Sequence, residues 1–484
     1  MKVKLSIKIF FLVLYAGMLF SQSVPTSDGI SRFVNDRDLH NANISISVID
    51  IENNELVAGH RPHKVLVPAS SLKLLTSLTA LKHLKPDATF NSQLSYDGEI
   101  RADGTLEGNI YFIGSGDPTF GSDRIDGCAP FEQTLSKIVS AIKSAGINCI
   151  KGQIIIDESV FDSYPVAPSW QWNDLGNYYA SGAWGVNVNE NLYYVHFGDR
   201  MLLGSQPSIE KVYPYIPGLN LSNEITIDSA HTGDNAYIFG GPYNDNKRIV
   251  GTIPQGKGLF TIKGSIPDPP SFLGYHIARA LDEANIQNEG YKTQYHDDNR
   301  TRKDISEFAS PSILEIVRIT NFKSLNLHAE CLLKKMGLQE RGQGSGQNGI
   351  AVINSMLRKY QIPSGEYNLE DGSGLSARNQ VSSFALSRFL SGISNEIAFD
   401  QISYTIPKGG VDGNVRSLFK NSPAKGKLWL KSGSMGGIQS YTGYIQTESG
   451  QILSFSIIAN GFSAKGSVIR RKMATLIESL YYLK

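Results

Sequence analysis

The stretch Ser70-Ser-Leu-Lys73 decides the fold class, because it opens a helix directly after an extended segment that ends in Pro68 and Ala69. Leucines recur through it at positions 72, 75, 78 and 81, and this spacing predicts a helix with one apolar face. Ser70 would then lie near the positive end of the helix dipole, where backbone N–H groups are free to hold an oxyanion. Lys73 follows one turn later on the same face. A hydroxyl and an amine placed in this way predict a nucleophile and its base.

Two further motifs follow in the order Ser324-Leu-Asn326 and Lys431-Ser-Gly433. Each is common by chance, but the ordered set of three is typical of serine acyl transferases. A serine hydroxyl is a weak nucleophile until a base removes its proton. Lys73 could be that base if burial and the like charge of Lys431 lower its pKa. We therefore predict that Ser70 forms an acyl intermediate.

The same chemistry predicts roles for the other polar residues of these motifs. Ser324 would relay a proton to the leaving amine, and Asn326 would bind the peptide group of the substrate. The Lys431 amine and the Ser432 hydroxyl suit a terminal carboxylate. Gly433 has no Cβ, so we expect a substrate to lie against this edge of the strand.

Competing matches to these patterns are weaker. Other stretches also match Ser-x-x-Lys, among them 140–143, 417–420 and 422–425, and each is more typical of a helix face or a surface segment. His231-Thr-Gly233 fits a variant of the third motif, but it precedes Ser324 and follows a turn instead of a strand. Two plainer interpretations stay open, because Ser70 could be only a helix N-cap and Lys431-Ser-Gly433 only a turn.

The composition describes a folded protein of more than one domain. A chain of 484 residues with 41% apolar and 19% charged residues is too long for one ordinary core, which predicts two to three domains. Its formal charge of +1 gives no basis for non-specific nucleic-acid binding. Cys128, Cys149 and Cys331 lack zinc-site spacing, and we expect neither a metal nor a cofactor. A Cys128–Cys149 disulfide and three buried thiols are both open.

The N-terminus is typical of an export signal. Lysines at positions 2, 4 and 8 precede the apolar run from Ile9 to Phe20, which is too short to span a bilayer comfortably. We predict a signal peptide over residues 1–23 and an exported protein located in the periplasm or cell-wall space. The alternative is an uncleaved leader that anchors the chain in the membrane.

The rest of the chain has helix-and-strand patterns at both ends and a β-rich middle. Short strand patterns dominate from about residue 91, and helical spacing returns after Pro270. Near the C-terminus, segments 441–445 and 452–459 flank Glu448-Ser-Gly450 as an antiparallel hairpin. The simplest topology is one α/β catalytic domain, residues 24–90 and 270–484, interrupted by a β-rich insertion at 91–269.

Around these motifs the sequence resembles the low-molecular-mass class C penicillin-binding proteins, the D-alanyl-D-alanine carboxypeptidase/endopeptidase family. The resemblance runs from about residue 30 to the C-terminus and includes Gly114-Ser-Gly-Asp-Pro118, Ile156-Asp-Glu-Ser-Val-Phe161, Trp170-Gln-Trp-Asn-Asp-Leu175, Asp371-Gly-Ser-Gly-Leu-Ser376 and Gly410-Val-Asp-Gly-Asn414. The long separation of Lys73 from Ser324 is unlike class A β-lactamases. Two departures from the family pattern are Ser432, where threonine is commoner, and Leu325, where Asp or Asn is often seen.

The resemblance implies an α+β catalytic domain of the penicillin-binding-protein and β-lactamase type, with an antiparallel sheet and flanking helices. It also implies two nested subdomains in the insertion, and an oxyanion hole formed by the backbone N–H groups of Ser70 and Ser434. We expect the segment from Asp371 to Ser376 to be a glycine-rich loop near the site, although its polar residues also fit plain turn chemistry.

The resemblance further implies a pocket for the side chain of a stem peptide, lined by Trp170, Trp172, Asp174 and Tyr179. Asp174 would face the ammonium group of that side chain. A buried aromatic core with a capping Asp explains the same residues equally well. We interpret His328 and Glu330 as helix-face residues, since the mechanism needs neither.

We therefore expect an exported serine D-Ala-D-Ala carboxypeptidase, endopeptidase or both, which acts on peptidoglycan stem peptides and is acylated by penicillin at Ser70. One alternative is a β-lactamase, which would hydrolyse penicillin with rapid turnover. A second is a catalytically silent peptidoglycan-binding scaffold, which would retain cell wall without binding penicillin.

Overall fold

One antiparallel five-stranded sheet has the strand order β2-β1-β22-β21-β20. It forms the centre of the part of the molecule made by residues 27–90 and 310–483, which we call the catalytic body. It joins both ends of the chain in the computed structural model, which describes residues 27–296, 298 and 300–483. Its strands are β1 (Asn43–Asp50), β2 (Leu56–His60), β20 (Leu428–Met435), β21 (Ile438–Gln446) and β22 (Ile452–Asn460). The predicted C-terminal hairpin is confirmed, since β21 pairs with β22 from Ile438 to Gln446. The strand that carries the third motif, β20, lies at one edge.

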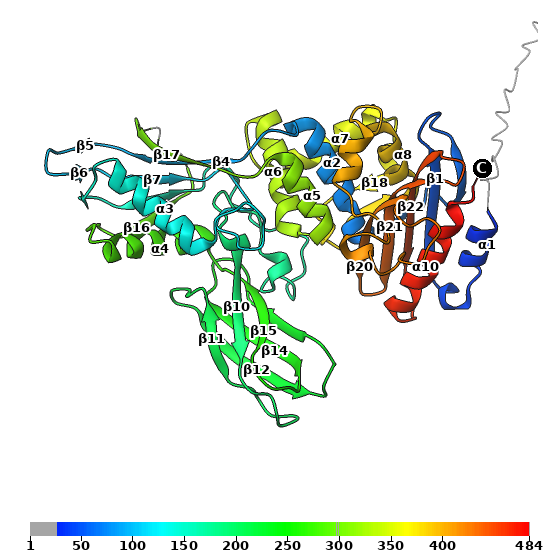
Figure 1. Ribbon diagram of the computed structural model, residues 1–484, viewed down its shortest axis with the longest axis horizontal. Helices are drawn as coiled ribbons and strands as arrows, with labels where there is room; N and C mark the ends of the chain where they lie inside the picture. The colour runs from blue at the N-terminus through cyan, green and yellow to red at the C-terminus, as the bar shows by residue number, and fades with distance from the viewer. Residues whose placement is uncertain (1–26, 297, 299, 484) are drawn as a thin grey trace, which may run out of the picture.

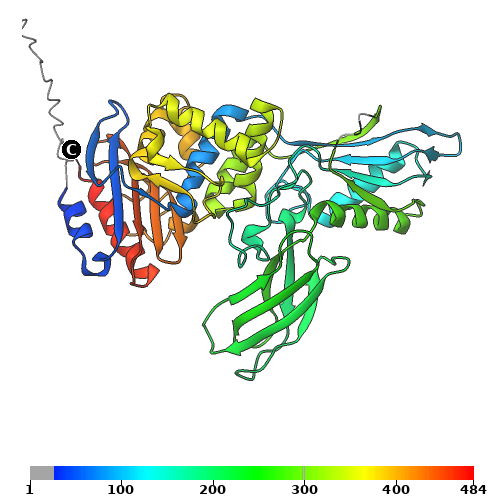
Figure 2. The same cartoon turned by 180° about the vertical axis from the view of Figure 1, so that it is seen from behind.

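Helices cover both faces of this sheet (Figures 1 and 2). Neighbouring residues of β22 show the alternation, because Ile457 belongs to the core on one face and Ile458 to the core on the other. The first face is covered by α1 (Asp28–Val34) and α10 (Gly466–Leu480). On the second face lie α2 (Lys73–Leu84), α5 (Ile313–Lys323), α6 (Asn326–Arg341), α7 (Gly346–Lys359), α8 (Ser383–Ile393) and α9 (Phe399–Tyr404). The predicted α+β fold with an antiparallel sheet and flanking helices is confirmed.

The helix predicted after Ser70 forms, and it is buried on every side. All residues from Lys73 to Leu81 are buried. The helix is therefore covered on more than the one apolar face that the leucine spacing predicts. A separate small sheet contains β3 (Val65–Leu66), β18 (Tyr367–Asn368) and β19 (Gln380–Ser382). Its strands neighbour one another in the order β18-β19-β3.

After Leu84 the chain leaves this body and forms two lobes, which we call the inner lobe and the nested lobe (Figure 1). The inner lobe holds a five-stranded sheet in the order β16-β9-β7-β4-β17 and a three-stranded sheet in the order β5-β6-β8. Its elements are β4 (Asn91–Tyr96), β5 (Glu99–Ile100), β6 (Thr105–Glu107), β7 (Ile110–Ile113), α3 (Phe131–Ser144), β8 (Cys149–Ile150), β9 (Ile154–Asp157), α4 (Pro269–Glu283), β16 (Tyr291–Gln294) and β17 (Lys303–Ala309).

The nested lobe is inserted between β9 and α4 and projects away from the inner lobe (Figures 1 and 2). It contains two three-stranded sheets, β11-β10-β15 and β12-β14-β13. Its strands are β10 (Leu192–Phe197), β11 (Ile209–Tyr213), β12 (Asn220–Asp228), β13 (Asn235–Phe239), β14 (Asn246–Pro254) and β15 (Phe260–Ser265).

The boundary expected at residue 270 does not match these pairings. β16 pairs with β9, and β17 pairs with β4 from Lys303 to Ala309, so both strands complete the inner-lobe sheet. The helix α4 packs beside them, since Ile277 shares the hydrophobic core of Ile154 and Ile156. We therefore place the insertion at residues 91–309. Sequence patterning missed this because the pairing joins strands about 200 residues apart in the chain.

Two further expectations concern the termini and the cysteines. The predicted export signal lies outside the described residues. Within the described part of the chain, no helix is both long and apolar enough to cross a bilayer. Cys128, Cys149 and Cys331 are all free thiols, and only Cys331 is buried. The structure therefore has neither the Cys128–Cys149 disulfide nor three buried thiols.

Candidate active site

Ser70 lies in a short 3-10 helix, η2 (Ala69–Leu72), that leads directly into α2 at Lys73. Ala69 has a φ of +48°, and this left-handed conformation costs a non-glycine residue about 1 kcal/mol. Strain of this kind is found where the surrounding structure fixes a functional residue. The Lys73 Nζ donates a hydrogen bond to Ser70 Oγ at 3.0 Å. The structure thus brings the predicted nucleophile and base within reach of direct proton transfer.

The Lys73 amine is fully enclosed by polar partners. It also donates to Asn326 Oδ1 at 2.5 Å and to the carbonyl oxygen of Ser373 at 2.7 Å. Burial lowers the pKa of Lys73 to about 8, while the carboxylates of Asp371 and Glu330 act in the opposite direction. A substantial neutral fraction therefore exists near neutral pH, and neutral amine is the form that can accept the proton of Ser70.

Ser324 and Asn326 occupy the junction of two helices. Helix α5 ends at Lys323 and α6 begins at Asn326. Ser324 and Leu325 therefore form the whole connection, and Asn326 is the first residue of α6. Ser324 has a φ of +57° and caps α5 in the left-handed region. The Asn326 Nδ2 donates to the carbonyl oxygen of Tyr179 at 2.7 Å. The side-chain amide of Asn326 is therefore hydrogen-bonded at both ends. Its oxygen accepts from Lys73, and its nitrogen donates to a residue of the insertion.

Lys431 is buried on β20 beneath the cleft. Its Nζ donates to Ser324 Oγ at 2.9 Å and to the carbonyl oxygen of Ser432 at 2.8 Å. Burial, together with the like charge of Lys73, holds the pKa of Lys431 well below its ordinary value. The two hydroxyl–amine pairs, Ser70 with Lys73 and Ser324 with Lys431, are thus built alike.

Gly433 has a packing role that the sequence did not indicate. A Cβ at Gly433 would come within 2.5 Å of the carbonyl oxygen of Pro68 and 2.8 Å of the Ser71 backbone nitrogen. Those atoms belong to the turn that carries Ser70, so the glycine lets β20 pack against that turn. Its neighbour Ser432 accepts a hydrogen bond from Asn414 Nδ2 at 2.7 Å.

A cleft of about 580 Å³ opens above these residues. Its walls come from the catalytic body and from the insertion, and they include Ser70, Ser324, Asn326, Ser434, Asp174, Tyr179, Tyr237, Gly374, Leu375 and Met435. Asp174 accepts a hydrogen bond from the Tyr179 hydroxyl at 3.0 Å, and burial raises its pKa. A carboxyl group of the insertion therefore lines the same cleft as the predicted nucleophile.

The four residues expected as one aromatic cluster separate in the structure. Asp174 and Tyr179 line the cleft, but Trp172 is 65% exposed and packs against Phe239 with ring centroids 4.6 Å apart. Among the described residues, Trp172 is not part of the cleft wall. Trp170 is buried, and its indole Nε1 donates to Asp371 Oδ2 at 2.8 Å.

His328 and Glu330, expected as helix-face residues, are both buried, and sequence reasoning missed the contacts that Glu330 makes. Glu330 accepts hydrogen bonds from the backbone N–H groups of Gly372 and Ser373 at 3.0 and 2.7 Å. Burial beside Asp371 raises the pKa of Glu330 to about 7. The available signal was its spacing, four residues after Asn326 on the same helix face. Burial lowers the pKa of His328 to about 3.

The loop from Asp371 to Ser376 contacts the site through the Ser373 carbonyl oxygen, which accepts a hydrogen bond from Lys73. Asp371 accepts backbone hydrogen bonds from Gly374 and Ser376 at 2.7 and 2.6 Å, and one from Asn379 Nδ2 at 2.8 Å. These bonds hold the turn that presents the Ser373 carbonyl to Lys73. The glycine-rich loop is thus close to the site, as expected, and its polar side chains fold the loop.

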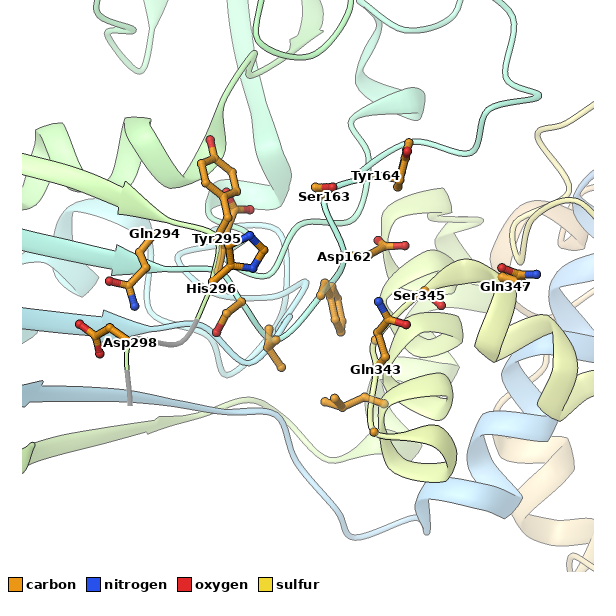
Figure 3. Close-up of a pocket in the computed structure, with 17 residues that line it drawn as sticks. Asp162, Ser163, Tyr164, Gln294, Tyr295, His296, Asp298, Gln343, Ser345 and Gln347 are labelled. Carbon is orange, nitrogen blue, oxygen red and sulfur yellow. The ribbon is translucent and has the colours of Figure 1, made fainter. Parts of the chain in front are cut away.

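The competing motifs and a second, larger cavity lie away from this cleft. Ser140 and His231 are exposed, on α3 and in the nested lobe. A cavity of about 940 Å³ opens where the two lobes meet the α6–α7 connection, between Tyr295 and His296 on one side and Gln343 and Ser345 on the other (Figure 3). In the described part of the chain, no group of three or more His, Cys, Asp or Glu side chains is arranged to hold a metal ion.

Comparison with known proteins gives one consistent family. The model of the D-Ala-D-Ala carboxypeptidase 3 (S13) family matches residues 26–480. A D-alanyl-D-alanine carboxypeptidase of Actinomadura sp. (strain R39) is 22% identical over 90% of this chain and 81% of its own length. Carboxypeptidase DacB of Haemophilus influenzae is 23% identical over 90% and 89%. The crystal structure of penicillin-binding protein 4 (dacB) from Haemophilus influenzae superposes with a TM-score of 0.81 at 21% identity, covering 95% of this chain and 100% of that one.

Proposed function

Because the chain belongs to the D-Ala-D-Ala carboxypeptidase 3 (S13) family and is a serine-type carboxypeptidase, we propose that Ser70 is its nucleophile and peptidoglycan stem peptides are its substrates. The observation that carries this assignment is the hydrogen bond of 3.0 Å from Lys73 Nζ to Ser70 Oγ in a buried site. A structure of the Haemophilus influenzae relative in complex with a β-lactam has a TM-score of 0.75 to this chain. We propose that β-lactams acylate Ser70 here as well.

In the first half of the reaction, neutral Lys73 accepts the proton of Ser70 as the serine oxygen attacks the carbonyl carbon between the two D-Ala residues. The backbone N–H groups of Ser70 and Ser434 would hold the resulting oxyanion, and one such donor typically contributes about 3 kcal/mol. Ser324 then gives a proton to the leaving amine. Lys431, bonded to Ser324 at 2.9 Å, replaces that proton.

In the second half, water attacks the acyl-Ser70 ester and releases the shortened peptide. The water passes a proton to Ser324 as Ser324 gives its own proton back to the Lys431 amine that lost one in the first half. Lys73, which now carries the proton taken from Ser70, returns it to the serine oxygen as the ester breaks. The same steps cleave a D-Ala–diamino-acid cross-link if the leaving amine belongs to a neighbouring stem peptide. We propose both activities, with Asp174 binding the ammonium group of the residue at position three.

Export completes the proposal. Peptidoglycan lies outside the cytoplasm, and the lysine-rich N-terminus followed by the run Ile9 to Phe20 is typical of an export signal. The mature enzyme would then work in the periplasm or cell-wall space. Fractionation of cells that express the full chain tests this, and an enzyme found only in the cytoplasm would contradict it.

Mass spectrometry of penicillin-treated protein tests the nucleophile. We expect one covalent adduct on the Ser70 peptide, no adduct on Ser70→Ala, and an unchanged adduct on Ser140→Ala, whose serine is exposed on α3. An adduct on Ser140 or Ser417 would overturn the assignment. The lifetime of the adduct separates the alternatives, since rapid turnover favours a β-lactamase and no adduct favours a silent scaffold.

A further inference from the structure

Two hydrogen bonds join the segment 170–179, which precedes the strands of the nested lobe, to the partners of Lys73. The Lys73 amine has three acceptors, Ser70 Oγ, Asn326 Oδ1 and the Ser373 carbonyl oxygen. Asn326 is bonded to the carbonyl of Tyr179, and the loop that contains Ser373 is bonded through Asp371 to Trp170. Two of the three acceptors are therefore held by residues that belong to the insertion.

The segment that carries Trp170 and Tyr179 is itself fixed to the nested lobe. Asn177 accepts a hydrogen bond from the Ile238 backbone N–H on β13 at 3.0 Å. Its own amide nitrogen donates to the carbonyl oxygens of Asn173 and Asp174 at 2.9 and 3.2 Å. The Ser265 backbone N–H on β15 donates to the Gly176 carbonyl oxygen at 3.0 Å. The strands of the nested lobe thus determine where Tyr179 and its carbonyl lie.

We propose that the insertion is a positioning element of the active site, and that Trp170 is the positioning residue through which it orients Lys73. The indole N–H of Trp170 holds Asp371, Asp371 folds the loop 371–376, and this loop presents the Ser373 carbonyl to the Lys73 amine. Trp170 does not itself line the cleft, although its neighbour Gln171 does, and its indole N–H is bonded to Asp371, so the proposed effect passes through Asp371. The proposal rests on Lys73 being the base, as set out above.

The same chain of contacts sets the charge around Lys73. The charged groups that face its amine are Glu330 on α6, Asp371 in the loop and Lys431 on β20. The Trp170 indole N–H is bonded to the Asp371 carboxylate, and the carboxylates of Asp371 and Glu330 favour the protonated form of Lys73. Without the indole N–H, the Asp371 carboxylate and the Ser373 carbonyl are no longer held facing the Lys73 amine, and they stabilise its protonated form less. The pKa of Lys73 then falls, and acylation turns on at a lower pH.

Trp170→Phe and Trp172→Phe are a matched pair of variants for the test. Both remove an indole from the same segment, but only Trp170 is bonded to Asp371. The measurement is the second-order rate constant for acylation by a fluorescent penicillin from pH 5 to 10. In the wild-type protein we expect this rate to rise with pH through a midpoint of about 8, the pKa of Lys73.

For Trp170→Phe we expect a rate at the high-pH plateau lower by about tenfold, the effect of one hydrogen bond to a charged group, and a midpoint shifted to lower pH. Trp172→Phe should stay within twofold of wild type at every pH. A general loss of structure would lower the rate at every pH by the same factor, without moving the midpoint.

A second measurement uses the wild-type protein and does not depend on the folding of Trp170→Phe. The ¹⁵N–¹H resonances of the four indoles (Trp170, Trp172, Trp184 and Trp429) can be assigned by replacing the last three in turn. We expect the Trp170 resonance to shift across the pH range in which acylation turns on, and the Trp172 resonance to stay constant.

The proposal is overturned if Trp170→Phe matches wild type within twofold, if its rate falls with an unmoved midpoint, or if the Trp170 resonance does not titrate. A wild-type protein that forms no penicillin adduct would instead contradict the proposed function, so the two failures are distinguishable.

Discussion

At the scale of single residues, the site consists of two hydroxyl–amine pairs placed in a buried environment. Burial changes the acidity of both amines, since it lowers the pKa of Lys73 to about 8 and, with the like charge of Lys73, holds the pKa of Lys431 well below its ordinary value. Asp174 differs from both, because it belongs to the insertion and lines the same cleft as Ser70. The role proposed for it is selection of the substrate, which can be tested apart from acylation.

The prediction at this scale is that Asp174→Asn changes substrate preference without changing acylation. For a stem peptide with a free ammonium at position three, we expect kcat/KM to fall by about tenfold, since a charge-assisted contact contributes about 1.5–3 kcal/mol. The same peptide with an acetylated amine should lose little. Steady-state kinetics on the two peptides measure the difference, with benzylpenicillin acylation as the control. Equal losses for all three ligands would show that Asp174 has only a structural role.

At the scale of elements, the site depends on the contact between β20 and η2. The third motif reaches the nucleophile because Gly433 lets the strand pack against the carbonyl of Pro68 and the backbone nitrogen of Ser71. The η2 turn also receives the Ser440 hydroxyl from β21, which lies 3.0 Å from Ser71 Oγ. The strand and turn therefore form one rigid unit around Ser70.

We expect Gly433→Ala to separate these elements. The added Cβ would lie 2.5 Å from the Pro68 carbonyl oxygen, and overpacking of this kind costs about 1–3 kcal/mol. A shift of about 1 Å at Ser70 should slow acylation by about a hundredfold. Gly365→Ala is the control, because a Cβ there would meet no described atom within 4 Å. Acylation rates and thermal unfolding of both variants decide the matter, and equal rates would refute the role of the glycine.

At the scale of the whole molecule, the catalytic body and the insertion behave as one structure. Lys334 on α6 is buried and donates to Asp162 Oδ1 at 2.8 Å. It also donates to the carbonyl oxygens of Tyr164 and Ala183, each at 2.9 Å. A single catalytic-body amine thus binds three separate points of the insertion next to the site.

We expect Lys334→Ala to lower the free energy of unfolding by about 3–5 kcal/mol, because it leaves the Asp162 carboxylate without its buried partner. Lys359→Ala removes an ion pair of similar length, 2.7 Å to Glu396, from a side chain that is 58% exposed. Its cost should stay below about 1 kcal/mol. Urea unfolding followed by circular dichroism compares the two. Midpoints that shift equally would mean that Lys334 does not hold the insertion in place.

The sequence by itself determined the catalytic chemistry, because the residue types and order of the three motifs do not depend on where the chain places them. Ser70, Lys73, Ser324, Asn326 and Lys431 could be named for this reason, and so could the C-terminal hairpin. Only the tertiary structure decided the end of the insertion, the packing role of Gly433 and the separation of Trp170 from Trp172. Those features depend on contacts between segments far apart in the chain, such as β4 with β17 and Trp170 with Asp371. Local patterns do not encode such contacts, since any strand edge or buried donor has many possible partners until the chain has folded.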